Sequence, residues 1–215
     1  MALSKVNFNS MNVTPAASKA IKFNSSNNGL ETGDMGGSLV LLSTQTASNS
    51  SSITFTSDID STYKEYIFKC INIQSGDESG DFAFQVDTGT NTSYNQSITS
   101  TFFDAYHTEA DDANDLRYLG GSRDQANQTA LQALSVLSSG GSDECENGTL
   151  HLFDPSNTTF VKHFMSRFSG MITGNYAGDQ FSAGYVNTTT ALTRVKFALT
   201  SGNITSGTIK MYGVV

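Results

Sequence analysis

Residues 63–73, which read YKEYIFKCINI, constrain the fold of this chain more than any other stretch. Read with a period of two, apolar side chains fall on both of its faces: Tyr66, Phe68 and Cys70 on one, Ile67, Ile71 and Ile73 on the other. Aromatic and β-branched residues, which favour strands, dominate the stretch. A strand that is apolar on both faces is expected inside a sheet that is covered on both sides.

From residue 38 onward, the chain reads as a succession of apolar segments separated by polar turns. We predict strands at 39–46, 52–57, 63–73, 82–87, 98–106, 130–137, 149–153, 160–172, 179–186, 192–200 and 207–215. Within 104–119 we expect a helical turn instead. Short strands at this spacing, without helices between them, predict an all-β fold, an antiparallel β-sandwich of the jelly-roll type.

Two of these strands are predicted to be neighbours. Phe82, Phe84 and Val86 share one face of their strand, and Ala83 and Gln85 lie on the other. This alternation is typical of a half-exposed strand, which we expect to pair antiparallel with residues 63–73.

The core of the sandwich is predicted from the apolar positions of the strands. In the segment 160–172, Phe164 and Phe168 face one side, while His163 and Met165 face the other. The residues expected in the core are Tyr66, Ile67, Phe68, Ile71, Ile73, Phe82, Phe84, Phe164, Phe197 and Ile209.

Residues 1–37 show little periodicity, and we predict that they form an extended N-terminal attachment arm preceding a sandwich domain at 38–215. One or two helical turns are expected over 14–21, with Thr14 as the N-cap. The arm carries apolar residues that suit contact with a neighbouring subunit or partner: Val6, Phe8, Ile21, Phe23 and Leu30.

The charge balance narrows the range of partners. The chain has 12 basic and 20 acidic residues and a formal net charge of −8. Nucleic-acid binding depends on clustered Lys and Arg, so we expect no nucleic-acid partner. No apolar run reaches membrane-spanning length, so we expect no membrane insertion.

The chain has two cysteines. Cys70 is expected in the core and Cys145 in an acidic turn, and a disulfide between them is left open.

The sequence points to no catalytic, cofactor-binding or metal-binding residues, and we expect a protein that is not an enzyme. The three histidines, His107, His151 and His163, lack zinc-ligand spacing. No Gly-x-Ser-x-Gly elbow occurs. Two groups of acids offer oxygen ligands for a hard cation but lack the twelve-residue calcium loop: Asp111, Asp112 and Asp115, and Asp58 with Asp60.

Four segments together resemble a known family: 37–48 (GSLVLLSTQTAS), 53–63 (ITFTSDIDSTY), 148–156 (GTLHLFDPS) and 201–213 (SGNITSGTIKMYG). They resemble virion structural proteins of marine tailed bacteriophages of the cyanophage and pelagiphage kind, which are often described as tail-fibre proteins. The resemblance extends over nearly the whole chain and carries no catalytic residues. It implies a protein assembled in the host cytoplasm and exposed on the virion.

The resemblance sets the functional expectations. The first is a fibre-type protein that attaches the particle to its host, with other tail or capsid proteins and a host-surface glycan or protein as partners. The second is a capsid decoration protein that stabilises the head. The third is a carbohydrate-binding module or depolymerase. The small polar surface suits a repeated assembly, for which we expect a homotrimer.

Overall fold

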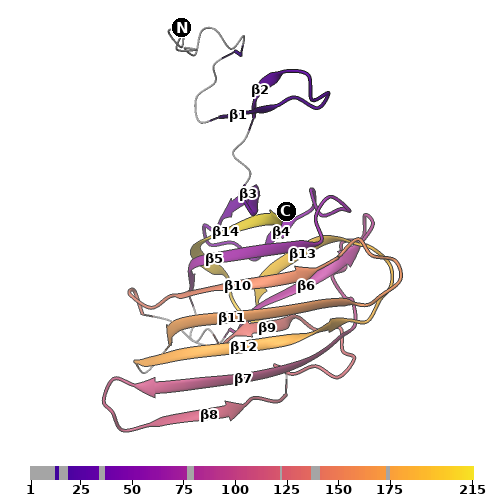
Figure 1. Cartoon of the computed structure of the whole chain (residues 1–215). Helices are drawn as coiled ribbons and strands as arrows, with labels where there is room; N and C mark the ends of the chain where they lie inside the picture. The colour runs from indigo at the N-terminus through magenta and orange to yellow at the C-terminus, as the bar shows by residue number, and fades with distance from the viewer. Residues whose placement is uncertain are drawn as a thin grey trace, which may run out of the picture. The chain divides into compact units, whose positions relative to one another are not determined.

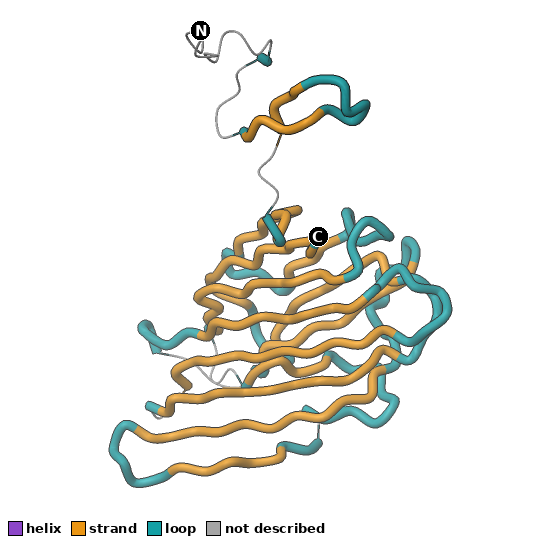
Figure 2. Tube along the Cα trace, viewed as in Figure 1, coloured by secondary structure: helices purple, strands orange, loops and turns teal. Residues whose placement is uncertain are grey.

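The computed structural model describes residues 13–14, 19–33, 37–76, 80–121, 123–136, 141–172 and 175–215. The chain divides into two compact units, Met1–Ser38 and Leu39–Val215. The second unit is an antiparallel β-sandwich (Figures 1 and 2). Among the described residues, no helix is long and apolar enough to cross a membrane.

The larger sheet of the sandwich has eight strands. Their order across the sheet is β3 (Leu39–Thr46), β14 (Ile204–Val214), β5 (Glu65–Ser75), β10 (Glu146–Phe153), β11 (Lys162–Ile172), β12 (Tyr176–Val186), β7 (Ile98–Thr108) and β8 (Asn114–Tyr118). The smaller sheet has the order β4 (Ile53–Phe55), β13 (Leu192–Leu199), β6 (Phe82–Thr88) and β9 (Gln132–Ser135). The region in which we expected a helical turn therefore contains strand β8, and that prediction was wrong.

The chain alternates between the two sheets. Strands β3 and β5 belong to the larger sheet, while β4 and β6 belong to the smaller one; β9 to β10 and β13 to β14 are further crossings. The predicted pairing of residues 82–87 with residues 63–73 was therefore wrong. Strand β6 pairs with β13 and β9, whereas β5 pairs with β14 and β10. Both strands turn their large apolar residues inward, so they face each other across the core instead of lying side by side.

Aromatic rings fill the space between the sheets. Phe197 of β13 lies 6.1 Å from Phe55, 5.3 Å from Phe68 and 5.8 Å from Phe82 between ring centroids. Such contacts add roughly 0.5–1.5 kcal/mol per pair beyond the burial of area. The core therefore has a continuous aromatic centre to which both sheets contribute.

Eight of the ten residues expected in the core are buried, and two are not. Ile67 is half-buried and Ile71 is 39% exposed. Strand β5 is covered on one face only, contrary to the prediction. Asn72 has a positive φ of 52° and lies where the register to both neighbouring strands shifts. This bulge reverses the alternation, so that Ile73 joins Phe68 on the inner face while Ile71 stays outside.

Strand β6 is also unlike the prediction, because both of its faces are buried. The Gln85 amide nitrogen donates to the carbonyl oxygens of Gln96, Thr129 and Ala130. The Asp87 carboxylate accepts hydrogen bonds from the backbone N–H of Tyr94 and from the amide of Gln96. Loop segments thus cover the polar face of this strand and satisfy its hydrogen-bonding groups.

The first unit contains a hairpin of β1 (Ala20–Phe23) and β2 (Leu30–Gly33). The helical turn expected over 14–21 is wrong at its end, because Ala20 and Ile21 belong to β1; residues 15–18 lie outside the described residues. The arm residues Ile21, Phe23 and Leu30 are exposed, Phe23 by 71%. Val6 and Phe8 lie outside the described residues.

Candidate binding face

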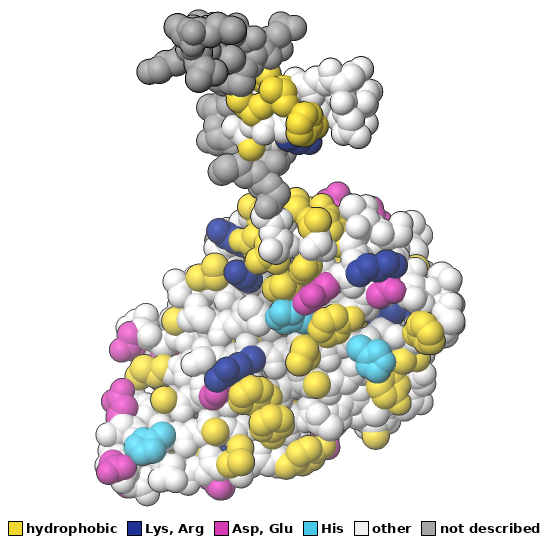
Figure 3. Space-filling view, viewed as in Figure 1, with side chains coloured by type: hydrophobic (Ala, Val, Ile, Leu, Met, Phe, Trp, Pro, Cys, Tyr) yellow, Lys and Arg dark blue, Asp and Glu magenta, His cyan; other side chains and the backbone are white. Residues whose placement is uncertain are grey.

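Exposed apolar side chains gather on one side of the sandwich domain. We call this side the outer face: the face of the eight-stranded sheet that is turned away from the four-stranded sheet (Figure 3). Of the ten exposed large hydrophobic residues described in the domain, eight belong to strands of the eight-stranded sheet, and seven of these point to the outer face: Leu39, Leu41, Ile71, Phe103, Leu116, Tyr118 and Met165. None of the ten belongs to a strand of the four-stranded sheet. Grouped exposed apolar residues mark interaction surfaces more often than single ones do.

One line of directly paired residues crosses the outer face from edge to edge. We call it the transverse row, and it contains Thr44, Lys210, Lys69, Thr149, Arg167, Phe181, Phe103 and Tyr118. The rings of Phe181 and Phe103 are stacked, with centroids 4.8 Å apart and planes 7° apart. The Arg167 guanidinium lies 5.0 Å from the centroid of Phe181. The row therefore changes from basic at one end to aromatic at the other.

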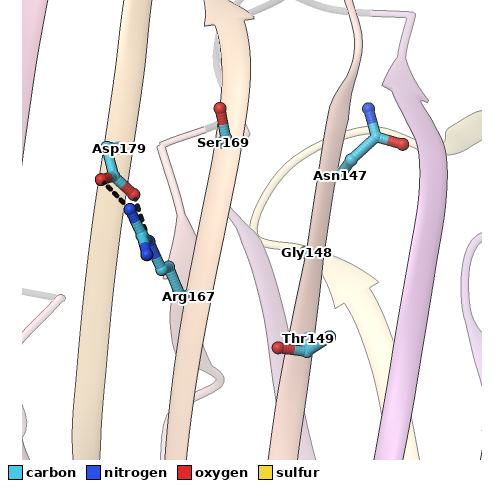
Figure 4. A pocket seen from close by; sticks show the side chains of 6 residues that line it. All are labelled: Asn147, Gly148, Thr149, Arg167, Ser169 and Asp179. Atoms are coloured by element: carbon cyan, nitrogen blue, oxygen red, sulfur yellow. Dashed lines mark hydrogen bonds and ion pairs between the residues drawn. The ribbon is translucent and has the colours of Figure 1, made fainter.

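A shallow hollow of ≈ 350 Å³ opens beside the middle of the row (Figure 4). It is lined by Asn147, Gly148, Thr149, Arg167, Ser169 and Asp179. Arg167 donates two hydrogen bonds to the Asp179 carboxylate, of 2.9 Å and 2.7 Å, and this contact raises the pKa of the guanidinium. The hydroxyl groups of Thr149 and Ser169 make no hydrogen bond to another described residue. The hollow thus offers an oriented ion pair and free hydroxyls to a polar ligand.

A glycine in β10, beside this hollow, allows close packing against the core side of the strand. Gly148 is paired with Phe168 and Cys70, which both face the core. A Cβ atom at Gly148 would collide with the ring of Phe168 and with the carbonyl oxygen of Arg167. The absence of a side chain lets the Phe168 ring cover the strand from the inside.

A second hollow of ≈ 280 Å³ lies at one end of β10 and β11. It is lined by Phe153, Asp154, Asn157, Phe160, Val161 and His163. Asp154 accepts hydrogen bonds from the Asn157 amide, at 2.9 Å, and from the Lys64 ammonium, at 3.0 Å, which together lower the pKa of its carboxyl. This hollow is more apolar than the first, and Phe160 at its rim is exposed.

An acid that the sequence did not single out is buried between the sheets. Glu146 of β10 is fully buried, and one of its carboxylate oxygens has no hydrogen-bond partner among the described residues. Burial raises the pKa of Glu146 to about 7, while the nearby Ser135 hydroxyl and Gln180 amide oppose that rise only in part. The negative charge of Asp81 raises it further. Gly170, paired with Glu146 on the next strand, leaves room for its side chain.

Acids that the sequence offered as metal ligands form hydrogen bonds with nearby residues of their own turns. Asp58 and Asp60 accept hydrogen bonds in a turn from Ser57 and Thr62, and Asp112 accepts one from Thr108. In the described parts of the chain, no group of three or more His, Cys, Asp or Glu residues is arranged to hold a metal.

The histidines and cysteines are separate from one another. His151 contacts Glu65 on the outer face, with Nδ1 2.6 Å from Oε1, and His107 contacts Asp111. Cys70 is buried, Cys145 is half-buried, and both are free, so the disulfide that the sequence left open does not form. Burial, with a smaller effect of the Glu146 charge, raises the pKa of the Cys70 thiol.

The sequence did not predict the transverse row or the hollow. The row joins residues from eight strands whose order in the sheet depends on the whole fold. One local signal was present, because Lys69 interrupts an otherwise apolar strand, but its pairing with Lys210 is not visible in the sequence.

Comparisons of the chain with protein-family models, with curated proteins and with solved structures found no match.

Proposed function

We propose that this chain is a non-catalytic structural protein on the surface of a tailed-phage virion, of the fibre type that takes part in attachment to the host. The observation that carries the proposal is the gathering of exposed apolar side chains on the outer face. A rigid sheet with such a face suits a protein that is held against partners and presents surface to them. The resemblance of the sequence to phage virion proteins supports the same function.

The strand order supports a jelly-roll architecture for the sandwich. The run β3-β14-β5-β10 in one sheet and β4-β13-β6-β9 in the other is the arrangement of two interleaved Greek keys. Strands β11, β12, β7 and β8 then extend the first sheet. Jelly rolls are common in viral capsid proteins and lectins.

We further propose that the chain assembles as a homotrimer and contacts other tail or capsid proteins through its N-terminal arm. The exposed Ile21, Phe23 and Leu30 of the hairpin suit such a contact, because a two-stranded hairpin gains little stability alone. Light scattering of the purified protein should give three times the chain mass of 23.0 kDa.

Labelling of intact particles tests the function. An antibody raised against the purified chain should bind projecting fibres in negative-stain images, and quantitative mass spectrometry should find a few tens of copies per particle. Hundreds of copies spread over the head would replace the fibre with a decoration protein, the alternative proposal. Absence of the chain from purified particles would refute both. Deletion of residues 1–37 should leave a folded domain that no longer joins the particle.

A carbohydrate-binding role is a second candidate, favoured by a specific observation. The hollow places an Arg–Asp pair and free hydroxyls next to the stacked rings of Phe181 and Phe103. Sugar-binding sites in proteins combine oriented polar groups with neighbouring aromatic side chains.

A further inference from the structure

Two lysines of the transverse row lie directly opposite each other. Lys69 of β5 and Lys210 of β14 are paired residues of neighbouring antiparallel strands and point to the outer face. Side chains in such pairs start about 4.5–5.5 Å apart at Cβ, and like charges there destabilise a sheet. Neither ammonium group forms an ion pair within the described part of the chain. The ring of Tyr212, whose centroid lies 5.4 Å from Nζ, partly compensates the charge of Lys69.

An anion bound between the two lysines would remove this repulsion. The outer-face strand positions carry Lys69, Lys210 and Arg167 against Glu65 and Asp179, which gives this face a formal charge of +1. The whole chain, by contrast, carries −8. The outer face is therefore a part of this acidic protein where a negatively charged ligand meets attraction and little repulsion.

The hollow continues directly from the lysine pair. Thr149, which lines it, is the paired neighbour of Lys69 on β10, and Arg167 follows on β11. Its volume of ≈ 350 Å³ lies at the lower end of the range for small-molecule sites. The free hydroxyls of Thr149 and Ser169 can exchange hydrogen bonds with sugar hydroxyls. The two Asp179 oxygens each accept one hydrogen bond from Arg167 and have a further lone pair for a sugar hydroxyl.

We propose that the outer face binds an acidic saccharide. The carboxylate or sulfate of the ligand lies between Lys69 and Lys210, and the adjoining sugar ring occupies the hollow between Thr149 and Asp179. This inference deepens the proposed attachment function. It rests on that function in one respect, which is that the saccharide belongs to a polysaccharide of the host cell surface. Three cations along one row are too few for a nucleic-acid backbone, whose binding depends on many phosphate contacts.

Calorimetry on the purified full-length protein tests the site with three oligosaccharide probes: an oligogalacturonate for the carboxylate, a sulfated galactan fragment for the sulfate, and neutral dextran. We expect binding to at least one acidic probe, no binding to dextran, and weaker binding at higher salt. The double substitution Lys69→Gln and Lys210→Gln should weaken binding about tenfold or more, because two charge-assisted contacts are lost.

Lys196→Gln is the matched control, because Lys196 also lies over a tyrosine ring, 4.9 Å from the centroid of Tyr94, but belongs to the four-stranded sheet. It should leave the affinity unchanged. The double variant should melt no lower than the wild type, since it removes a like-charge pair. Binding that survives the double substitution, equal binding of dextran, or no binding of either acidic probe would overturn the inference. None of these results affects the labelling of virions, which tests the proposed function separately.

Discussion

Replacement of Glu146 by Gln should change how the stability of the domain depends on pH. The carboxyl is fully buried, and its pKa is raised from an ordinary value of 4.5 to about 7. The folded protein therefore holds this proton more tightly than the unfolded chain does. Stability from this group is complete below pH 4.5 and is lost as the pH rises through about 7.

The size of the effect follows from the two pKa values. Each unit of difference corresponds to about 1.4 kcal/mol, so the full loss is on the order of 3 kcal/mol. Glu146→Gln keeps the shape of the protonated acid and cannot ionise. The variant should match the wild type in acid and exceed it in unfolding free energy by up to about 3 kcal/mol above neutral pH.

Urea unfolding followed by circular dichroism, repeated across this pH range, measures the difference between the two proteins. Taking the difference removes the titration of the other acids, which both proteins share. Glu109→Gln is the control, because Glu109 is exposed and accepts only a surface hydrogen bond from Asn175. A wild-type-minus-variant difference that stays flat with pH would refute the argument that Glu146 is protonated by burial.

Three further substitutions test the packing. Phe197→Ala, at the centre of the aromatic core, should cost about 3–5 kcal/mol of unfolding free energy, measured by urea unfolding. Asp104→Ala removes a buried carboxylate that accepts two hydrogen bonds from Arg117, and it should lower the unfolding free energy by about 1.5–3 kcal/mol. Asp179→Ala removes the same kind of pairing on the surface and should shift the melting temperature little. Equal effects of the two substitutions would contradict the role of burial. Gly148→Ala should cost about 1–3 kcal/mol because its Cβ meets the Phe168 ring, and an unchanged melting temperature would show that the ring can move aside.

The sequence by itself determined the all-β class and the inward or outward direction of many side chains. In β11, Phe164 and Phe168 are buried while His163 and Met165 lie on the outer face, as the alternation predicted. This information is local, because side chains of a regular strand alternate between the two faces regardless of what the strand pairs with. It failed at Asn72, where a bulge changes the alternation within a single strand.

The tertiary structure alone decided which strands are neighbours. Every feature of the outer face depends on that strand order. Backbone hydrogen bonds can join any two strands equally well, so the pattern of residues within a strand does not specify which strand it pairs with. The pairing is decided when the two sheets close over one core. That closure put β6 across the core from β5, and it placed Lys210 beside Lys69. It also enclosed Glu146, an acid at the first position of β10, and nothing in the sequence indicates that its side chain loses contact with water.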